Sequence, residues 1–163
     1  MFQVTLKIMR IPMKKTYLTL GSAAIVSLTL AGCGTQRLTL PIQPAASLST
    51  AKAAPGTDPA AKIAVYFGAQ PHPDVVRSVG NASHSLRVAR ATDGAEATCN
   101  KALATGLDKL RADAQSRGAN AVINVTTRFH GTETASATEY TCGVSPSAAA
   151  IAVTGELAVL QGN

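Results

Sequence analysis

An apolar stretch near the N-terminus limits how much of this chain can belong to a folded domain. Tyr17 to Leu30 carries no charge and follows the basic pair Lys14-Lys15. As a helix, this stretch would span about 21 Å, against about 30 Å for the hydrocarbon core of a bilayer. A basic flank before a short apolar segment is typical of a secretory signal peptide rather than of a transmembrane helix. We therefore expect residues 1–32 to be a leader, with Met13 as an alternative start.

The leader ends in a sequence that carries a thiol. Leu30-Ala31-Gly32-Cys33 resembles the lipobox of bacterial lipoproteins, in which the cysteine receives a diacylglycerol and becomes the mature N-terminus. The alternative is an ordinary secretory signal with a cysteine near its cleavage site. Gly34 stands where the family's inner-membrane retention signal has Asp, so the resemblance implies the outer membrane. We expect lipidation at Cys33, and a domain that faces the periplasm.

The segment behind Cys33 differs in composition from the rest of the chain. Residues 33–61 are rich in Pro, Ala, Ser and Thr. Such a composition buries too little apolar surface to offset the entropy lost on ordering. We predict a flexible tether over residues 33–61 and a folded domain over residues 62–163.

The positive charge of the chain is concentrated in the leader. The formal net charge is +6, but no acid precedes Cys33, whereas several basic residues do: Lys7, Arg10, Lys14 and Lys15. The charges that follow are nearly balanced. A balanced domain has little electrostatic attraction for a polyanion, so we expect no nucleic-acid partner.

The apolar pattern after residue 62 predicts an α+β domain. Alternating apolar residues predict strands over 63–67, 86–89, 121–129, 137–144 and 149–160, with alternate residues of 121–129 on one face. Apolar residues at threes and fours predict a helix between Asp93 and Gly118, with Asp93 as its cap and Glu96 reaching back. We expect one long helix on an antiparallel sheet of four to five strands, in two layers.

Cysteine usage predicts one disulfide bond. Lipidation would remove Cys33 from thiol chemistry, which leaves Cys99 on the inward face of the helix and Cys142 in the penultimate strand. An oxidising envelope compartment favours their pairing. A redox-active or metal-binding pair is the alternative, but neither a C-x-x-C spacing nor a nearby His or acid at ligand spacing supports it.

Several short segments resemble a known domain family. Gly118 to Val122, between helix and strand, resembles the corresponding segment of YbjQ-like domains, and the helix and strand cysteines resemble those of the lipoprotein sensor of the Rcs envelope-stress system. A closer resemblance is to small exported proteins often labelled "excinuclease ATPase subunit", through Val65 to Gly68, Cys99, and Tyr140 to Cys142. It covers residues 62–160 and implies a YbjQ-like fold. The chain lacks both the second disulfide of the Rcs sensor and a nucleotide-binding G-x-x-x-x-G-K-[ST] loop.

The sequence contains no recognisable catalytic motif. Its three histidines, His72, His84 and His130, lack metal-ligand spacing. Asp74, His84 and a serine could be combined into a catalytic triad, but no motif such as G-x-S-x-G supports that combination. We expect no enzyme activity, no metal and no cofactor. The expected role is binding another envelope component. The alternatives are an envelope-stress sensor that signals through a protein partner, and a small hydrolase or metal-dependent enzyme that uses His72 or His84.

Overall fold

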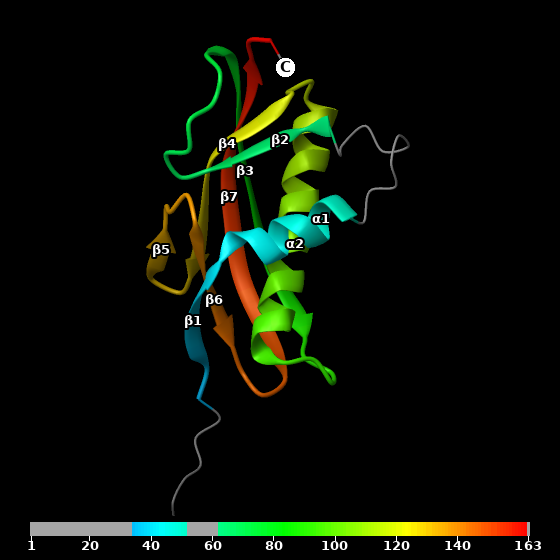
Figure 1. Cartoon of the computed structure of the whole chain (residues 1–163), viewed down its shortest axis with the longest axis vertical. Helices are drawn as coiled ribbons and strands as arrows, with labels where there is room; N and C mark the ends of the chain where they lie inside the picture. The colour runs from blue at the N-terminus through cyan, green and yellow to red at the C-terminus, as the bar shows by residue number, and fades with distance from the viewer. Residues whose placement is uncertain (1–33, 52–61, 163) are drawn as a thin grey trace, which may run out of the picture. The chain divides into compact units, whose positions relative to one another are not determined.

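The computed structural model describes residues 34–51 and 62–162, which form an α+β domain (Figure 1). The leader and Cys33 lie outside the described residues. The elements are β1 (Gln36–Pro41), α1 (Ile42–Ala51), β2 (Ala64–Phe67), β3 (Val75–Ala89), α2 (Ala95–Ser116), β4 (Ala121–Phe129), β5 (Thr132–Thr134), β6 (Glu139–Val144) and β7 (Ala148–Leu160). The expected α+β class is confirmed.

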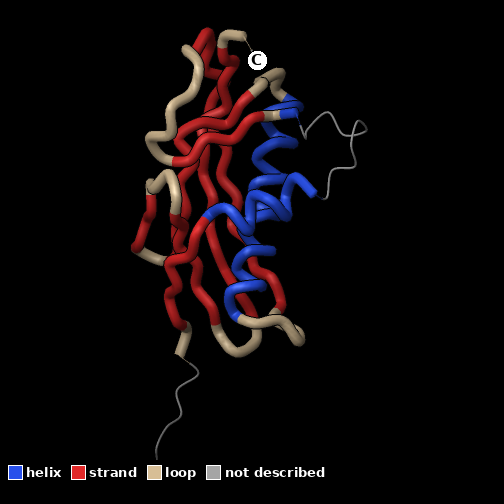
Figure 2. Tube along the Cα trace, viewed as in Figure 1, coloured by secondary structure: helices blue, strands red, loops and turns tan. Residues whose placement is uncertain are grey.

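The strands form one mixed sheet around the long strand β7. The sheet has seven strands in the order β1-β6-β7-β4-β2, with β3 paired to β7 and β5 paired to β4. All pairs are antiparallel except β2 with β4. Figure 2 shows both helices on one side of the strands. The prediction of a single helix on four to five antiparallel strands is therefore wrong in detail, although the two-layer arrangement holds.

The first strand and helix arise from the segment expected to be a tether. Strand β1 pairs along its whole length with β6, and Ile42 and Ala45 of α1 are buried in the main core. Pro41 ends the strand and Pro44 lies in the first turn of α1, a position that tolerates proline. The tether prediction is wrong for residues 36–51, because the edge of β6 and the surface of α2 supply partners that composition does not reveal. Residues 52–61 of that tether lie outside the described residues.

Helix α2 carries the apolar stripe expected of it. Leu103, Leu107 and Leu110 are fully buried against the sheet. A Cβ atom on Gly106 would lie 2.8 Å from Val153 Cγ2, so glycine allows the helix to pack closely on β7. The helix ends before Gly118, whose φ of +69° fits the expected stop.

The start of α2 differs from the expected capping box. Gly94 is the N-cap residue and no side chain caps the helix. The Asp93 carboxylate accepts a hydrogen bond from Lys101 instead. Asp93 therefore pairs with a lysine about two turns into the helix and does not cap the helix start.

The apolar side chains of strand β4 switch from one face of the sheet to the other partway along the strand. Ala121 and Ile123 belong to a small cluster with Ala158 and Leu160, whereas Val122 and Val125 point into the main core. Asn124 adopts a left-handed φ of 53°, and the pairing with β7 shifts register between Ile123 and Thr126. The prediction that alternate residues of 121–129 share one face is wrong, because this bulge inserts an extra residue.

Candidate functional site

The two domain cysteines are joined in the interior. Cys99 of α2 and Cys142 of β6 form a disulfide bond, with their Cα atoms 6.0 Å apart. Both residues are completely buried. Leu38 of β1 lies opposite Cys142 in the sheet register. The disulfide bond therefore joins α2 to β6 at the position where β1 pairs with β6. Burial keeps the sulfurs from other thiols, which favours a structural over a redox role.

A histidine and an aspartate pair across the helix–sheet interface. Nε2 of His84, on β3, lies 2.8 Å from Oδ2 of Asp113, on α2. The two side chains are 26% and 32% exposed. Such a pair can hold an imidazole in one orientation, which is one part of an acid–base apparatus.

The serine–histidine–aspartate triad that could be written from the sequence does not form. Asp74 lies just before β3, and His84 lies past the middle of β3. The extended strand places the two residues about 30 Å apart. Ser83 is next to His84 in the sequence, but its hydroxyl is hydrogen-bonded to the hydroxyl of Thr154 on the neighbouring strand. Asp113, the actual partner of His84, is not among the residues that the sequence pattern singled out.

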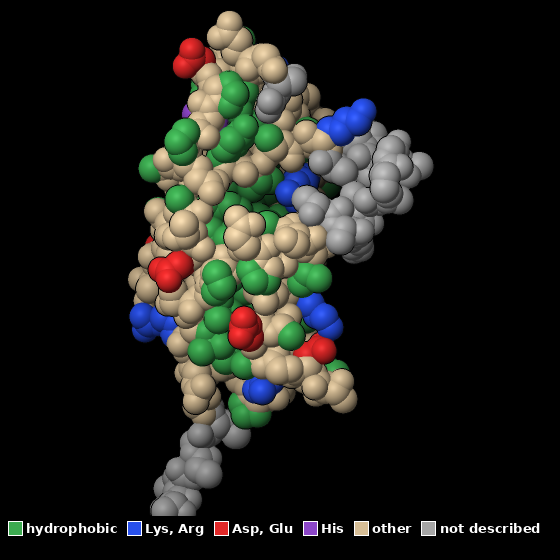
Figure 3. Space-filling view, in the orientation of Figure 1, with side chains coloured by type: hydrophobic (Ala, Val, Ile, Leu, Met, Phe, Trp, Pro, Cys, Tyr) green, Lys and Arg blue, Asp and Glu red, His purple; other side chains and the backbone are tan. Residues whose placement is uncertain are grey.

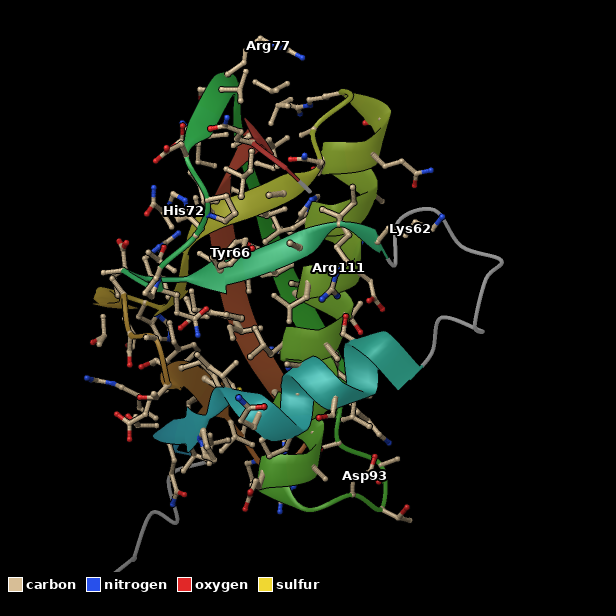
Figure 4. The ribbon with its side chains drawn as sticks, turned by 45° about the horizontal axis from the view of Figure 1, so that its top comes forward. Lys62, Tyr66, His72, Arg77, Asp93 and Arg111 are labelled. Atoms are coloured by element: carbon tan, nitrogen blue, oxygen red, sulfur yellow. A yellow bond between two sulfur atoms is a disulfide. The ribbon has the colours of Figure 1, made fainter. Side chains whose placement is uncertain are left out.

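The other two histidines lie outside the strands, and each packs against an aromatic ring. His72 packs edge-to-face against Tyr66 at 5.6 Å between ring centroids (Figure 4). His130 follows β4 in a left-handed conformation and packs against Phe129. Across residues 34–51 and 62–162, no cluster of three His, Cys, Asp or Glu side chains could hold a metal ion.

A buried arginine connects the two helices. Arg111 of α2 donates hydrogen bonds to the Ile63 carbonyl at 3.3 Å and to Ser49 Oγ of α1. Ser49 donates in turn to Asp108 Oδ1 at 2.6 Å, and Asp108 lies 3.7 Å from the Arg111 guanidinium. Burial lowers the pKa of Arg111, and the charge of Asp108 opposes that shift. Figure 4 shows Arg111 between α1 and β2, so this cluster holds α1 in place.

A hollow of about 530 Å³ lies beside the start of β1. Its lining comes from the residues around the beginning of β1 and from the turn between β4 and β5, namely Thr35, Arg37, Phe129, His130, Gly131 and Thr132. The lining combines one guanidinium with hydroxyls and rings. The described residues of the lining include no carboxylate, so they suit an anionic or polar group better than a cation.

The charges at the surface form no extended patch on the face shown in Figure 3. Acidic and basic side chains are interspersed there among apolar and polar ones. None of the helices in the described part of the chain is long and apolar enough to cross a membrane.

Comparisons with known proteins supply no assignment. No protein-family profile, curated protein or solved structure matches this chain.

Sequence reasoning missed the residues that hold α1 and β1. Ser49 and Arg111 carry no local signal, because their contact joins segments far apart in the chain. A signal for β1 was present, since Leu38, Leu40 and Ile42 alternate with polar or proline positions. The Pro-rich composition around these residues concealed that alternation.

Proposed function

We propose that this chain is an outer-membrane lipoprotein whose periplasmic domain binds another component of the cell envelope without catalysing a reaction. The observation that carries the proposal is Leu30-Ala31-Gly32-Cys33, which ends an apolar segment of signal-peptide length. A buried disulfide in the domain behind it supports an oxidising compartment. Cys33 is the proposed lipid attachment site.

We assign no catalytic role to the three histidines. His72, His84 and His130 each have a different environment, and only His84 pairs with a carboxylate. The resemblance to YbjQ-like domains remains part of the proposal for the fold. It rests on the sequence segments Gly118 to Val122, Val65 to Gly68 and Tyr140 to Cys142.

The anchor is tested by metabolic labelling of the full chain with an alkyne-bearing palmitate in a bacterial host. We expect the label to enter the protein and the protein to sediment with the outer membrane. Cys33→Ser should abolish both, because the thiol carries the lipid. Ala31→Ser keeps a small residue before the cleavage site and serves as the matched control. Labelling of the Cys33→Ser protein would exclude Cys33 as the attachment site.

The binding role is tested by crosslinking in intact cells followed by mass spectrometry. We expect a defined envelope component to crosslink to the anchored protein, and the crosslink to be lost with Cys33→Ser. A crosslink to the Rcs-type signalling machinery, with a change in a stress reporter, would favour the sensor alternative. The disulfide between helix and strand resembles one of the two in that sensor, and this chain lacks the cysteines for the second.

An enzyme is the second class of function, and the 2.8 Å contact between His84 and Asp113 favours it over other catalytic arrangements. A hydrolase should keep its activity as a soluble domain and lose it in His84→Ala. A metal enzyme should contain stoichiometric metal after purification without chelators. Stoichiometric metal together with the absence of any crosslinked partner would contradict the binding proposal.

A further inference from the structure

The link between the proposed lipid site and the domain is very short. Only Gly34 and Thr35 separate Cys33 from Gln36, the first residue of β1. Covalent geometry allows at most about 11 Å between the Cα atoms of Cys33 and Gln36. A lipid on Cys33 would therefore hold the beginning of β1 close to the headgroup layer.

Strand β1 is firmly part of the domain. Its pairing with β6 runs from Gln36 opposite Val144 to Pro41 opposite Glu139. Strand β6 is tied to α2 by the disulfide at Cys142, and α1 continues directly from β1. The domain cannot turn independently of β1 unless these contacts break. The short link consequently restricts the orientation of the whole domain.

The sheet register identifies which surface lies at this end. Val144, opposite Gln36, also pairs with Ala149 of β7, and Ala148 pairs with Ala89 at the end of β3. The start of β1, the turn 145–147 and the loop 90–94 thus lie together, and we call them the β1 end. Figure 1 shows this end opposite the C-terminus.

The chemistry of the β1 end suits phospholipid headgroups. The turn 145–147 is Ser-Pro-Ser, and Arg90 donates to its carbonyl oxygens from both backbone and side chain. Arg37 lines the hollow beside the start of β1. Of the acids nearby, Asp93 is paired with Lys101, and Glu96 lies in the first turn of α2. Basic side chains near a membrane surface are attracted to anionic lipids.

We propose that the β1 end faces the bilayer and contacts phospholipid headgroups, while the opposite end projects into the periplasm. This inference rests on the proposed lipidation of Cys33. The opposite end carries Val75 and Val76, which are 43% and 65% exposed. The length of β7 separates the two ends by about 40 Å. The two ends therefore differ clearly in their distance from the lipid.

Orientation is tested with a photoreactive benzophenone amino acid placed at Ser147, at the β1 end. The matched variant carries the same amino acid at Val76, at the opposite end. Both full-length proteins are checked by mass for the lipid and illuminated in vesicles of phosphatidylethanolamine and phosphatidylglycerol. We expect at least tenfold more lipid adduct from position 147 than from position 76. Equal yields from the two positions would overturn the proposed orientation.

A linker variant separates orientation from anchoring. A long Gly-Ser insertion between Thr35 and Gln36 should keep the protein on the vesicles but reduce the preference for position 147. An unchanged preference would show that the short link does not set the orientation. If the measured mass shows that cells do not lipidate Cys33, that result contradicts the proposed function. The orientation is then tested on the chain beginning at Cys33, coupled through its thiol to a maleimide lipid.

Discussion

Tyr140 is the largest fully buried side chain of the described domain. Its hydroxyl donates a 2.7 Å hydrogen bond to Asn100 Oδ1 on α2. Burial, followed by the charge of Glu96, raises the pKa of Tyr140 above its ordinary value of 10.0. The folded domain therefore holds this phenol in its neutral form.

Removing the Tyr140 hydroxyl should destabilise the domain. Tyr140→Phe leaves the carbonyl of Asn100 buried without its donor, which costs about 1–3 kcal/mol. Urea denaturation at neutral pH measures this loss. Asn100→Leu in the Tyr140→Phe background should recover part of it, since both polar groups are then absent. A variant as stable as the parent would contradict the role assigned to this bond.

The same residue predicts how stability depends on alkaline pH. The pKa of Tyr140 is higher in the folded than in the unfolded state, so only the unfolded state loses the proton just above pH 10.0. Unfolding then releases a proton, and the free energy of unfolding should fall by about 1.4 kcal/mol per pH unit. Below that pH this stabilisation is fully present. The slope attributable to Tyr140 should disappear in Tyr140→Phe, measured by urea titrations between neutral pH and pH 11.

The disulfide between Cys99 and Cys142 should contribute much of the domain's stability. The bond spans a sequence separation of 43, and closing such a loop restricts the unfolded chain by about 4 kcal/mol. Reduction under denaturing conditions followed by refolding should lower the free energy of unfolding by about that amount. The Cys99→Ala/Cys142→Ala variant controls for the reductant and should not respond to it. An unchanged stability after reduction would remove the bond from this account.

At the scale of elements, α1 depends on contacts that it makes with α2. Ile42 and Ala45 bury their side chains in the main core, and Ser49 shares its hydroxyl between Arg111 and Asp108. A short helix of low charge has little stability of its own. Its position is therefore set by this apolar contact together with the buried polar cluster.

Ser49→Ala should loosen α1. The change deprives the buried Arg111 of an acceptor, at a cost of about 1–3 kcal/mol. Hydrogen exchange should show faster exchange of the α1 amides, with less effect on β7. Gln43→Ala changes an exposed side chain of the same helix and serves as the control. Equal exchange in the two variants would show that the Ser49 hydroxyl does not hold the helix.

At the scale of the whole molecule, the folded unit begins well before residue 62. Strand β1 covers the edge of β6, and α1 covers part of α2. A chain that starts at Lys62 would expose both surfaces, and an uncovered strand edge invites association with other chains. The structure therefore places the start of the folded domain no later than β1.

This boundary predicts a difference between two truncated chains. The chain that begins at Lys62 should lose at least about 3 kcal/mol relative to one that begins at Gly34, because the apolar contacts of Ile42 and its neighbours are removed. It should also scatter more light at high concentration. Urea denaturation and static light scattering compare the two. Similar stability of both chains would mean that β1 and α1 are dispensable.

Features with a local pattern could be predicted from the sequence. Helix α2 has an apolar stripe and a glycine stop, and strands β2, β6 and β7 follow alternating residues. The disulfide followed from counting, since Cys99 and Cys142 are the cysteines that remain after Cys33. The stripe of α2 reflects burial of one face, which repeats at the period of the helix. Strands β6 and β7 are instead buried along almost their whole length, so their alternation in sequence does not record which face is covered.

Only the tertiary structure decided the remaining features. Asn124 turns β4 over in mid-strand, and His84 pairs with Asp113 rather than with Asp74. Arg111 reaches Ser49 across a gap of many residues. In each case the partner is distant in the chain and brought close by the fold, so no local period records it. The sequence by itself determined the helix, most strands and the cysteine pair, whereas packing decided where the domain begins and which polar groups meet.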